Sequence, residues 1–185
     1  MRDGKTRRGW SATGIGGLGR RCLFAAVLLV AAWSLEAIAA AETADTNPSG
    51  LPIPRFVSLR SDEVNLRTGP GLTYPIDWIY QRSGMPVEVV EEFDTWRKIR
   101  DWEGTEGWVH QSMLDGKRTF VVIGSDVQRM RLAPEADAHP AARLSPGVIG
   151  NLLECGPTWC RGDVQGYHGW IERNLIFGVL PNETF

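Results

Sequence analysis

Cysteine and histidine are scarce in this chain of 185 residues, which is long enough for one ordinary domain or two small ones. It holds three Cys and three His, which leaves few combinations for a metal centre or a thiol–imidazole pair. Beyond residue 41 there are 14 basic and 20 acidic residues. Such an acidic body argues against a nucleic-acid partner, whose phosphate backbone needs clustered positive charge.

No hydrophobic run is long enough for an ordinary membrane span. The apolar run Cys22–Leu35 has 14 residues, against the roughly 20 that cross a bilayer. Arg20 and Arg21 precede it, and the alanine-rich segment 37–41 follows. A basic start, a short apolar core and an A-x-A exit predict a helical secretory signal peptide over residues 1–41. We therefore expect a periplasmic or secreted protein; if the signal is not cleaved, it would be the only membrane contact.

Helical periodicity is also lacking after the signal peptide. Residues 42–54 are polar, contain three prolines and read as a linker. From residue 55 onward, short apolar runs rich in β-branched residues are separated by Gly, Pro and Asp, which predicts strands. The expected fold class is all-β.

The strand-rich part repeats itself. Matching segments lie 64, 63 and 62 residues apart from the start of the repeat to its end, a drift typical of small loop deletions. The matches are Leu66-Arg67 with Met130-Arg131, Trp96 with Trp159, and Gly107-Trp108-Val109 with Gly169-Trp170-Ile171. Two tandem modules, 55–118 and 119–185, are therefore predicted.

The first module carries a recognisable order of motifs. The segment Val64-Asn65-Leu66-Arg67-Thr68-Gly69-Pro70-Gly71 comes first, and Tyr74-Pro75, Thr95-Trp96-Arg97-Lys98-Ile99 and Glu106-Gly107-Trp108-Val109 follow. This order resembles the bacterial Src-homology-3-like (SH3-like) domain, and the second module resembles it in a divergent form. The resemblance implies two tandem small SH3-like β-barrels of exported, often cell-wall-associated type. It also implies binding rather than catalysis.

Glycines and tryptophans of the repeat suggest structural roles. Gly69 and Gly71 flank Pro70 and predict a sharp turn with unusual backbone angles. Gly107 is expected to leave space for a large aromatic side chain from another strand. The repeated pairs Trp96/Trp159 and Trp108/Trp170 are expected to anchor the barrels.

Cys155 and Cys160 flank a turn sequence, Gly156-Pro157-Thr158-Trp159, between two predicted strands. Cross-strand partners in such a hairpin come close enough for a disulfide, which an oxidising compartment would favour. The first module has Glu92 and Arg97 at the equivalent positions. The same cross-strand contact is therefore expected as a salt bridge in one module and as a disulfide in the other.

Catalytic chemistry finds little support. A thioredoxin-type motif has two residues between its cysteines, whereas four separate Cys155 from Cys160. A zinc site from these cysteines and His168 lacks an evident fourth ligand, and a Cys–His hydrolase would need a free thiol. We expect no enzyme, no cofactor and no metal.

Aromatic side chains that the repeat does not share are the better candidates for ligand contact. These are Tyr74, Trp78, Tyr80 and Trp102, together with Arg67, which could orient a carboxylate or pair with a neighbouring acid. Exposed aromatics suit sugar stacking or peptide contacts, although Trp78 and Tyr80 could instead pack between the modules. The expected ligand is peptidoglycan or another cell-wall component. The alternative is a basic or proline-containing segment of an envelope protein.

Overall fold

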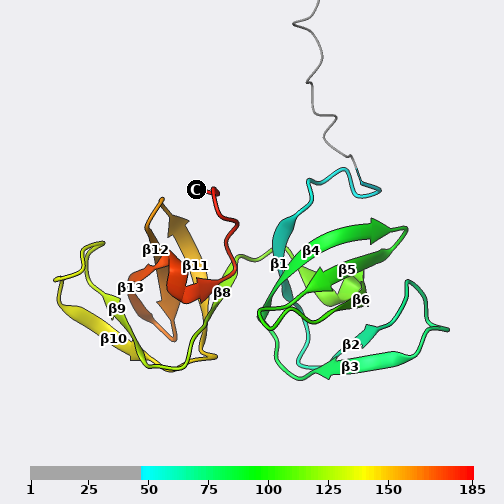
Figure 1. The fold of residues 1–185 in the computed structure, drawn as a ribbon, viewed down its shortest axis with the longest axis horizontal. Helices are drawn as coiled ribbons and strands as arrows, with labels where there is room; N and C mark the ends of the chain where they lie inside the picture. Colours follow the sequence, from blue (N-terminus) through cyan, green and yellow to red (C-terminus); the bar gives the residue numbers. More distant parts are fainter. Residues whose placement is uncertain (1–46) are drawn as a thin grey trace, which may run out of the picture. The chain divides into compact units, whose positions relative to one another are not determined.

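The computed structural model describes residues 47–185. The expected signal peptide, 1–41, lies outside the described residues. Between residues 47 and 185 the chain is all-β, with fourteen strands, two single-turn 3-10 helices and no α-helix (Figure 1). No helix in this described part has the length and apolar character needed to cross a membrane. The expected fold class is confirmed.

The first module is one seven-stranded sheet in the order β3-β2-β6-β5-β4-β1-β7, which leaves β3 at an edge. Its elements are β1 (Arg55–Leu59), β2 (Val64–Arg67), β3 (Ile76–Tyr80), β4 (Pro86–Phe93), β5 (Trp96–Arg100), β6 (Glu106–His110), η1 (Gln111–Met113) and β7 (Leu114–Asp115).

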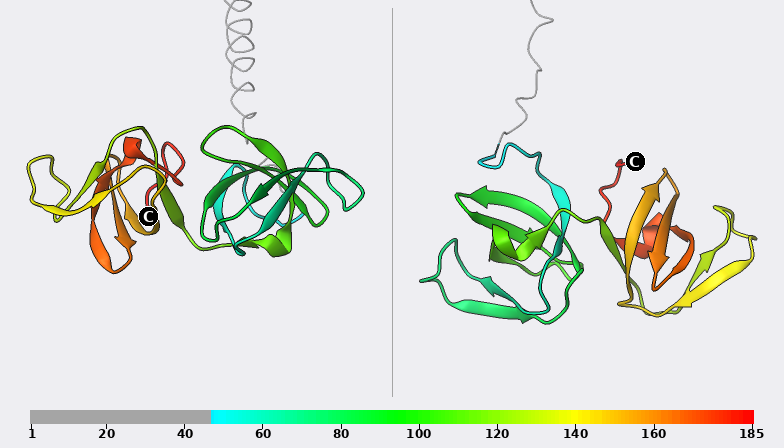
Figure 2. Two further views of the ribbon diagram at one scale, coloured as in Figure 1. Left: turned by 90° about the horizontal axis from the view of Figure 1, so that it is seen from below. Right: turned by 180° about the vertical axis from the view of Figure 1, so that it is seen from behind.

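The second module repeats this topology strand for strand, in the order β10-β9-β13-β12-β11-β8-β14. Its elements are β8 (Thr119–Val122), β9 (Gln128–Arg131), β10 (Pro140–Leu144), β11 (Ile149–Cys155), β12 (Trp159–Val164), β13 (Tyr167–Glu172), η2 (Arg173–Leu175) and β14 (Ile176–Phe177). Figure 2 shows the two copies from two further sides, the first in cyan to green and the second in yellow to red. The tandem repeat is confirmed.

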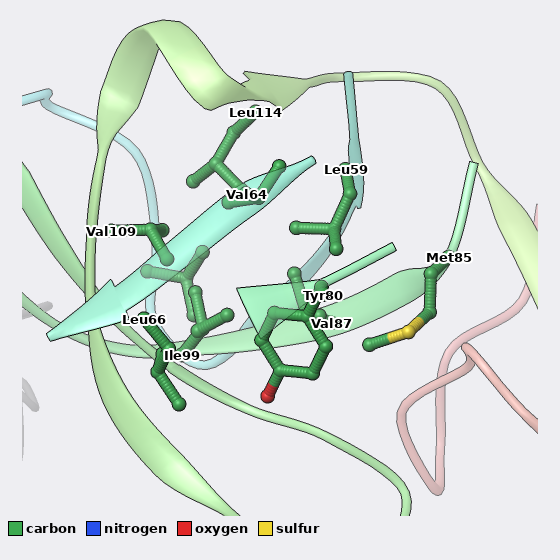
Figure 3. Packing of buried hydrophobic residues seen from close by; sticks show 10 residues of the cluster. Leu59, Val64, Leu66, Tyr80, Met85, Val87, Ile99, Val109 and Leu114 are labelled. Atoms are coloured by element: carbon green, nitrogen blue, oxygen red, sulfur yellow. The ribbon is translucent and has the colours of Figure 1, made fainter. Parts of the chain in front are cut away.

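Each module closes around its own apolar core. The first core is seen in Figure 3, where Leu59, Val64, Val87 and Ile99 come from four different strands. In the second, Phe120 occupies the centre and packs against Gly150 and Gly162, where an added Cβ would lie 2.6 and 2.5 Å from its ring. These glycines are therefore required by the size of one aromatic ring.

Gly107 has a different neighbour from the one expected. A Cβ there would meet the side chain of Leu66 at 2.6 Å, and a Cβ at the equivalent Gly169 would meet Met130 at 2.5 Å. The expected aromatic is absent because β2 crosses β6 closely at this point and presents an aliphatic residue. The expectation of an aromatic neighbour was wrong, whereas the need for a glycine holds in both modules.

The repeated tryptophans, expected to anchor the barrels, are more deeply buried in the first module than in the second, and Trp96 and Trp108 lie outside the first core cluster. Trp96 and Trp108 are buried. Trp159 and Trp170 are only half-buried.

The same cross-strand position carries different chemistry in the two modules, as expected. Glu92 and Arg97 are partners on β4 and β5, with Arg97 Nε 3.1 Å from the carboxylate. Cys155 and Cys160 are partners on β11 and β12 and form a disulfide with a Cα–Cα distance of 4.1 Å.

Replacing Cys155 and Cys160 together by alanine is expected to lower the free energy of unfolding by about 2 kcal/mol. A loop this short restricts the unfolded chain less than a 15-residue loop, for which about 3 kcal/mol is expected. Urea unfolding with and without reductant measures the difference. The double variant serves as the control, because reductant should not move its curve. An unchanged wild-type curve under reductant would contradict the expectation.

Candidate functional site

The first module exposes five large apolar side chains on one short stretch of chain. Leu72 and Tyr74 lie on the β2–β3 loop, and Ile76, Trp78 and Ile79 lie on β3. Trp78 is 58% exposed and Tyr74 45%. We call these five residues the β3 surface. Five exposed large apolar side chains within residues 72–79 mark this segment as a candidate binding site.

Arg67 holds the loop that carries two of the five residues of this surface. Its Nη1 donates to the carbonyl oxygens of Tyr74, at 2.7 Å, and Leu72, at 3.2 Å. The equivalent Arg131 donates to the carbonyl of Ala138 in the second module. Arg67 therefore has no acidic partner among the described residues and acts through the loop's backbone. The expectation that it pairs with a neighbouring acid was wrong.

Tyr74 is positioned by two glycines. A Cβ at Gly69 would lie 2.3 Å from the Tyr74 ring, and one at Gly71 would lie 3.3 Å from it. Neither glycine has a positive φ, so the expected unusual turn angles do not occur. The two glycines instead make room for the ring to lie against the loop, with its other side open to solvent.

Trp78 stands on an edge strand. Its backbone partner on β2 is Leu66, and among residues 47–185 no strand pairs with the other side of β3. A register shift between Leu66 and Arg67 marks a bulge beside it, a feature common where a strand re-aims a side chain. An exposed aromatic thus lies beside unpaired backbone groups that could accept a ligand.

Tyr80 does not belong to this surface. It is only 5% exposed and lies among the core side chains, as Figure 3 shows. Its hydroxyl donates to Asp101 Oδ2 at 3.0 Å. Burial, and then the negative charge of Asp101, raise the pKa of the Tyr80 phenol above its ordinary value. The prediction of Tyr80 as a contact residue was wrong, because the polar end of its ring is satisfied inside the module.

Trp102 is half-buried and packs against the first core rather than standing free at a hairpin tip. The turn around it is built on Asp101, whose Oδ1 accepts backbone N–H groups from Glu103 and Thr105 at 3.0 and 2.9 Å. Since Asp101 also binds Tyr80, this turn is tied to the last residue of β3. That Trp102 contacts a ligand remains a prediction, and only part of its side chain is accessible for such a contact.

Tyr80→Phe is expected to lower the free energy of unfolding by about 1–3 kcal/mol, because the buried Asp101 carboxylate loses a hydrogen bond. Urea denaturation measures it. Tyr74→Phe is the matched control, since it removes a hydroxyl from an exposed ring and should change stability by less than about 0.5 kcal/mol. Equal effects of the two substitutions would contradict the buried hydrogen bond.

The exposed groups of the β3 surface suit stacking and hydrogen bonding. Within residues 47–185, no group of three or more His, Cys, Asp or Glu is arranged to hold a metal ion. His110, in the first module, shares a hydrogen bond with Ser112 through Nδ1. Rings and unpaired strand groups suit a ligand with flat sugar faces or an extended peptide.

Three members of the β3 surface were not expected from the sequence, namely Leu72, Ile76 and Ile79. The run Ile76-Asp77-Trp78-Ile79-Tyr80 is apolar at four of five positions and looks like a buried strand. Its one signal of exposure is that it directly follows a proline-containing loop, as an edge strand can.

The family model described as "Bacterial SH3 domain" matches residues 60–116 and 124–178. A protein of Bacillus subtilis (strain 168), YrvJ, whose name proposes an N-acetylmuramoyl-L-alanine amidase, is 22% identical over 128 residues. The alignment covers 64% of this chain and 24% of YrvJ, so the chain spans about a quarter of that relative.

Two solved structures show a distant likeness. NlpC2 from Trichomonas vaginalis has a TM-score of 0.31 at 11% identity, over 67% of this chain and 48% of its own. An NlpC/P60 family protein from Bacillus cereus ATCC 10987 has a TM-score of 0.30 at 13% identity, over 66% and 55%. These scores are too low to support any conclusion about function.

Proposed function

Since the chain belongs to the bacterial SH3 domain family, in two tandem copies, we propose that it is a non-catalytic exported protein that binds peptidoglycan. The binding site is the β3 surface of the first module. The observation that carries the proposal is the pair of exposed aromatic rings, Tyr74 on a loop whose carbonyls Arg67 binds and Trp78 on the strand that follows it.

The relative's name supports a wall ligand. N-acetylmuramoyl-L-alanine, the group named in YrvJ's proposed activity, joins a sugar to a peptide. A ligand of that kind has sugar faces for the two rings and peptide groups for the open edge of β3. Export follows from the signal peptide expected over residues 1–41, which would place the protein in the same compartment as this ligand.

Charge limits how the wall can be bound. The part after residue 41 has an excess of six acidic residues, so attraction to an anionic wall cannot supply the affinity. Stacking and hydrogen bonding must do so, and both depend only weakly on salt. Wall binding through the β3 surface should therefore persist as ionic strength increases.

The second candidate is a scaffold that binds a basic or proline-containing segment of another envelope protein. The same acidic excess favours it, because a negatively charged protein attracts a basic partner. This attraction weakens steeply as the salt concentration rises. The β3 edge would accept the segment as an added strand.

Co-sedimentation with purified sacculi, across a salt series, separates the two candidates. The protein should pellet with sacculi at low salt and remain in the pellet as salt rises. A protein that stays in the supernatant at low salt would overturn direct wall binding. Capture of a basic peptide that is lost on adding salt would favour the scaffold.

A further inference from the structure

The second module has an open hollow where the first module has tryptophan. Ala142 pairs with Met130 on β10 and β9, as Trp78 pairs with Leu66 on β3 and β2, so Ala142 and Trp78 are equivalent. The hairpin that carries Trp102 in the first module is one residue shorter in the second, where Gln165-Gly166 forms its tip without an aromatic residue. A methyl group thus stands where the first module has the indole of Trp78, and a hollow lies beside β10.

This hollow has a volume of about 430 Å³, within the range of small-ligand sites. Leu144 and Val164 are buried beneath it, and Val148 is half-buried. Gln165 and Tyr167 are exposed at its border. Small aliphatic groups fit the apolar part, while an amide and a phenol remain available for hydrogen bonds.

One of the residues that line the hollow is an arginine. Arg143, which lines it, is the cross-strand partner of Arg129. The two arginines also line a smaller neighbouring hollow of about 180 Å³. Within residues 47–185, neither guanidinium takes part in an ion pair or a side-chain hydrogen bond.

Two like charges placed directly opposite each other destabilise a sheet. The equivalent positions in the first module are Asn65 and Ile79, which are uncharged partners. The arginine pair is therefore particular to the second module. A bound anion would neutralise it, and a carboxylate can accept hydrogen bonds from both guanidinium groups.

The backbone completes the site. In the part of the chain that the structure describes, β10 is the edge strand of its sheet and pairs only with β9. Its residues 141–144 line the hollow, so a ligand there lies alongside strand groups that have no neighbouring strand. An extended peptide can pair with such an edge, whereas a fatty acid has no groups with which to do so.

We propose that the hollow beside β10 binds the carboxy-terminal end of a peptide with small aliphatic side chains. The carboxylate binds Arg143 and Arg129, the side chains fill the apolar part, and the peptide backbone pairs with β10. This site is separate from the β3 surface and does not depend on the function proposed above.

Isothermal titration of the purified protein with tri-alanine tests the proposal, with tri-alanine amide and octanoate as comparison ligands. Tri-alanine should bind, and the amide should bind at least about tenfold more weakly because the charged hydrogen bonds are lost. Equal affinity for the amide, or no binding of tri-alanine at millimolar concentration, would overturn it. If octanoate binds as tightly as tri-alanine, the ligand is a fatty acid rather than a peptide, and this result would also overturn the proposal.

Two substitutions locate the site. Ala142→Trp restores the first module's residue and should abolish binding by filling the hollow. Arg143→Ala should weaken tri-alanine binding about tenfold. This second variant tests the location independently if the Ala142→Trp protein does not fold. Arg161→Ala is the matched control, because Arg161 is exposed in the same module and does not line the hollow. Unchanged binding by a folded Ala142→Trp protein or by Arg143→Ala would contradict the location.

Discussion

Glu92→Ala is expected to lower the free energy of unfolding by about 3–5 kcal/mol, the cost of removing one partner from a buried charge cluster. The Glu92 side chain is fully inaccessible to solvent. Its carboxylate accepts hydrogen bonds from Arg55 and, through two groups, from Ser49, and it faces Arg97 at 3.1 Å. Without it, the buried guanidinium of Arg97 loses its counter-charge.

Urea denaturation compares this variant with Glu91→Ala, the matched control on the neighbouring residue. Glu91 is exposed and lies 3.9 Å from Lys98. A surface pair of this kind contributes less than about 1 kcal/mol. Equal losses from the two substitutions would contradict the special role of the buried carboxylate.

The Glu92 contribution should also depend on pH. Burial raises the pKa of Glu92, but hydrogen bonds from Ser49 and Arg55 and the charge of Arg55 lower it more, so its pKa lies below the ordinary value. The stabilisation is therefore complete above the ordinary glutamate pKa of about 4.3 and is lost as pH falls through the lower, folded-state pKa. The stability difference between wild type and Glu92→Ala should stay constant near neutral pH and shrink in acid. A difference that grows in acid would contradict this sign.

Trp78→Ala is expected to weaken sacculus binding at least about thirtyfold, as the loss of a central aromatic contact worth about 2 kcal/mol or more. The side chain is more than half exposed and is not part of the first core. Its removal should therefore leave the free energy of unfolding nearly unchanged. Co-sedimentation with sacculi measures the binding, and urea denaturation checks the fold.

Phe93→Ala is the matched control for the tryptophan substitution. Phe93 is 59% exposed and ends β4 in the same module, outside the β3 surface. It removes a similar amount of exposed aromatic side chain and should leave pelleting unchanged. A loss of pelleting in both variants would show general stickiness of exposed aromatics rather than a site.

The fold could be predicted largely because the repeat gives each residue a second copy to be compared with. Aligning Glu92 and Arg97 with Cys155 and Cys160 identified a cross-strand position in each module. Oppositely charged residues and paired cysteines both need the short separation that antiparallel partners have. Because a salt bridge and a disulfide occupy the same position in the two modules, the pairing of the two strands in each hairpin could be predicted from the sequence.

The site could be predicted only in part, because exposure of a strand residue depends on which strands flank it. Trp78 and Tyr80 lie two positions apart on β3, so alternation places them on one face. Tyr80 is nevertheless buried in the core, whereas Trp78 is mostly exposed. Nothing in the local sequence distinguishes a strand residue that reaches the core from one on the same face that remains exposed.

Contacts that depend on the path of the backbone also escaped prediction. The role of Gly69 depends on a ring five residues further along, and that of Gly107 depends on β2 crossing β6. Arg67 binds backbone carbonyls, which the sequence does not distinguish from acidic side chains as partners. In each case the partner is set by the path of the backbone rather than by residue type.

The most direct test of wall recognition by the β3 surface is a titration of isotope-labelled protein with soluble peptidoglycan fragments, followed by amide chemical shifts. We expect the largest shifts at the β2–β3 loop, residues 68–75, and along β3. Large shifts confined to other strands, or none at all at millimolar fragment, would contradict the proposed site and ligand.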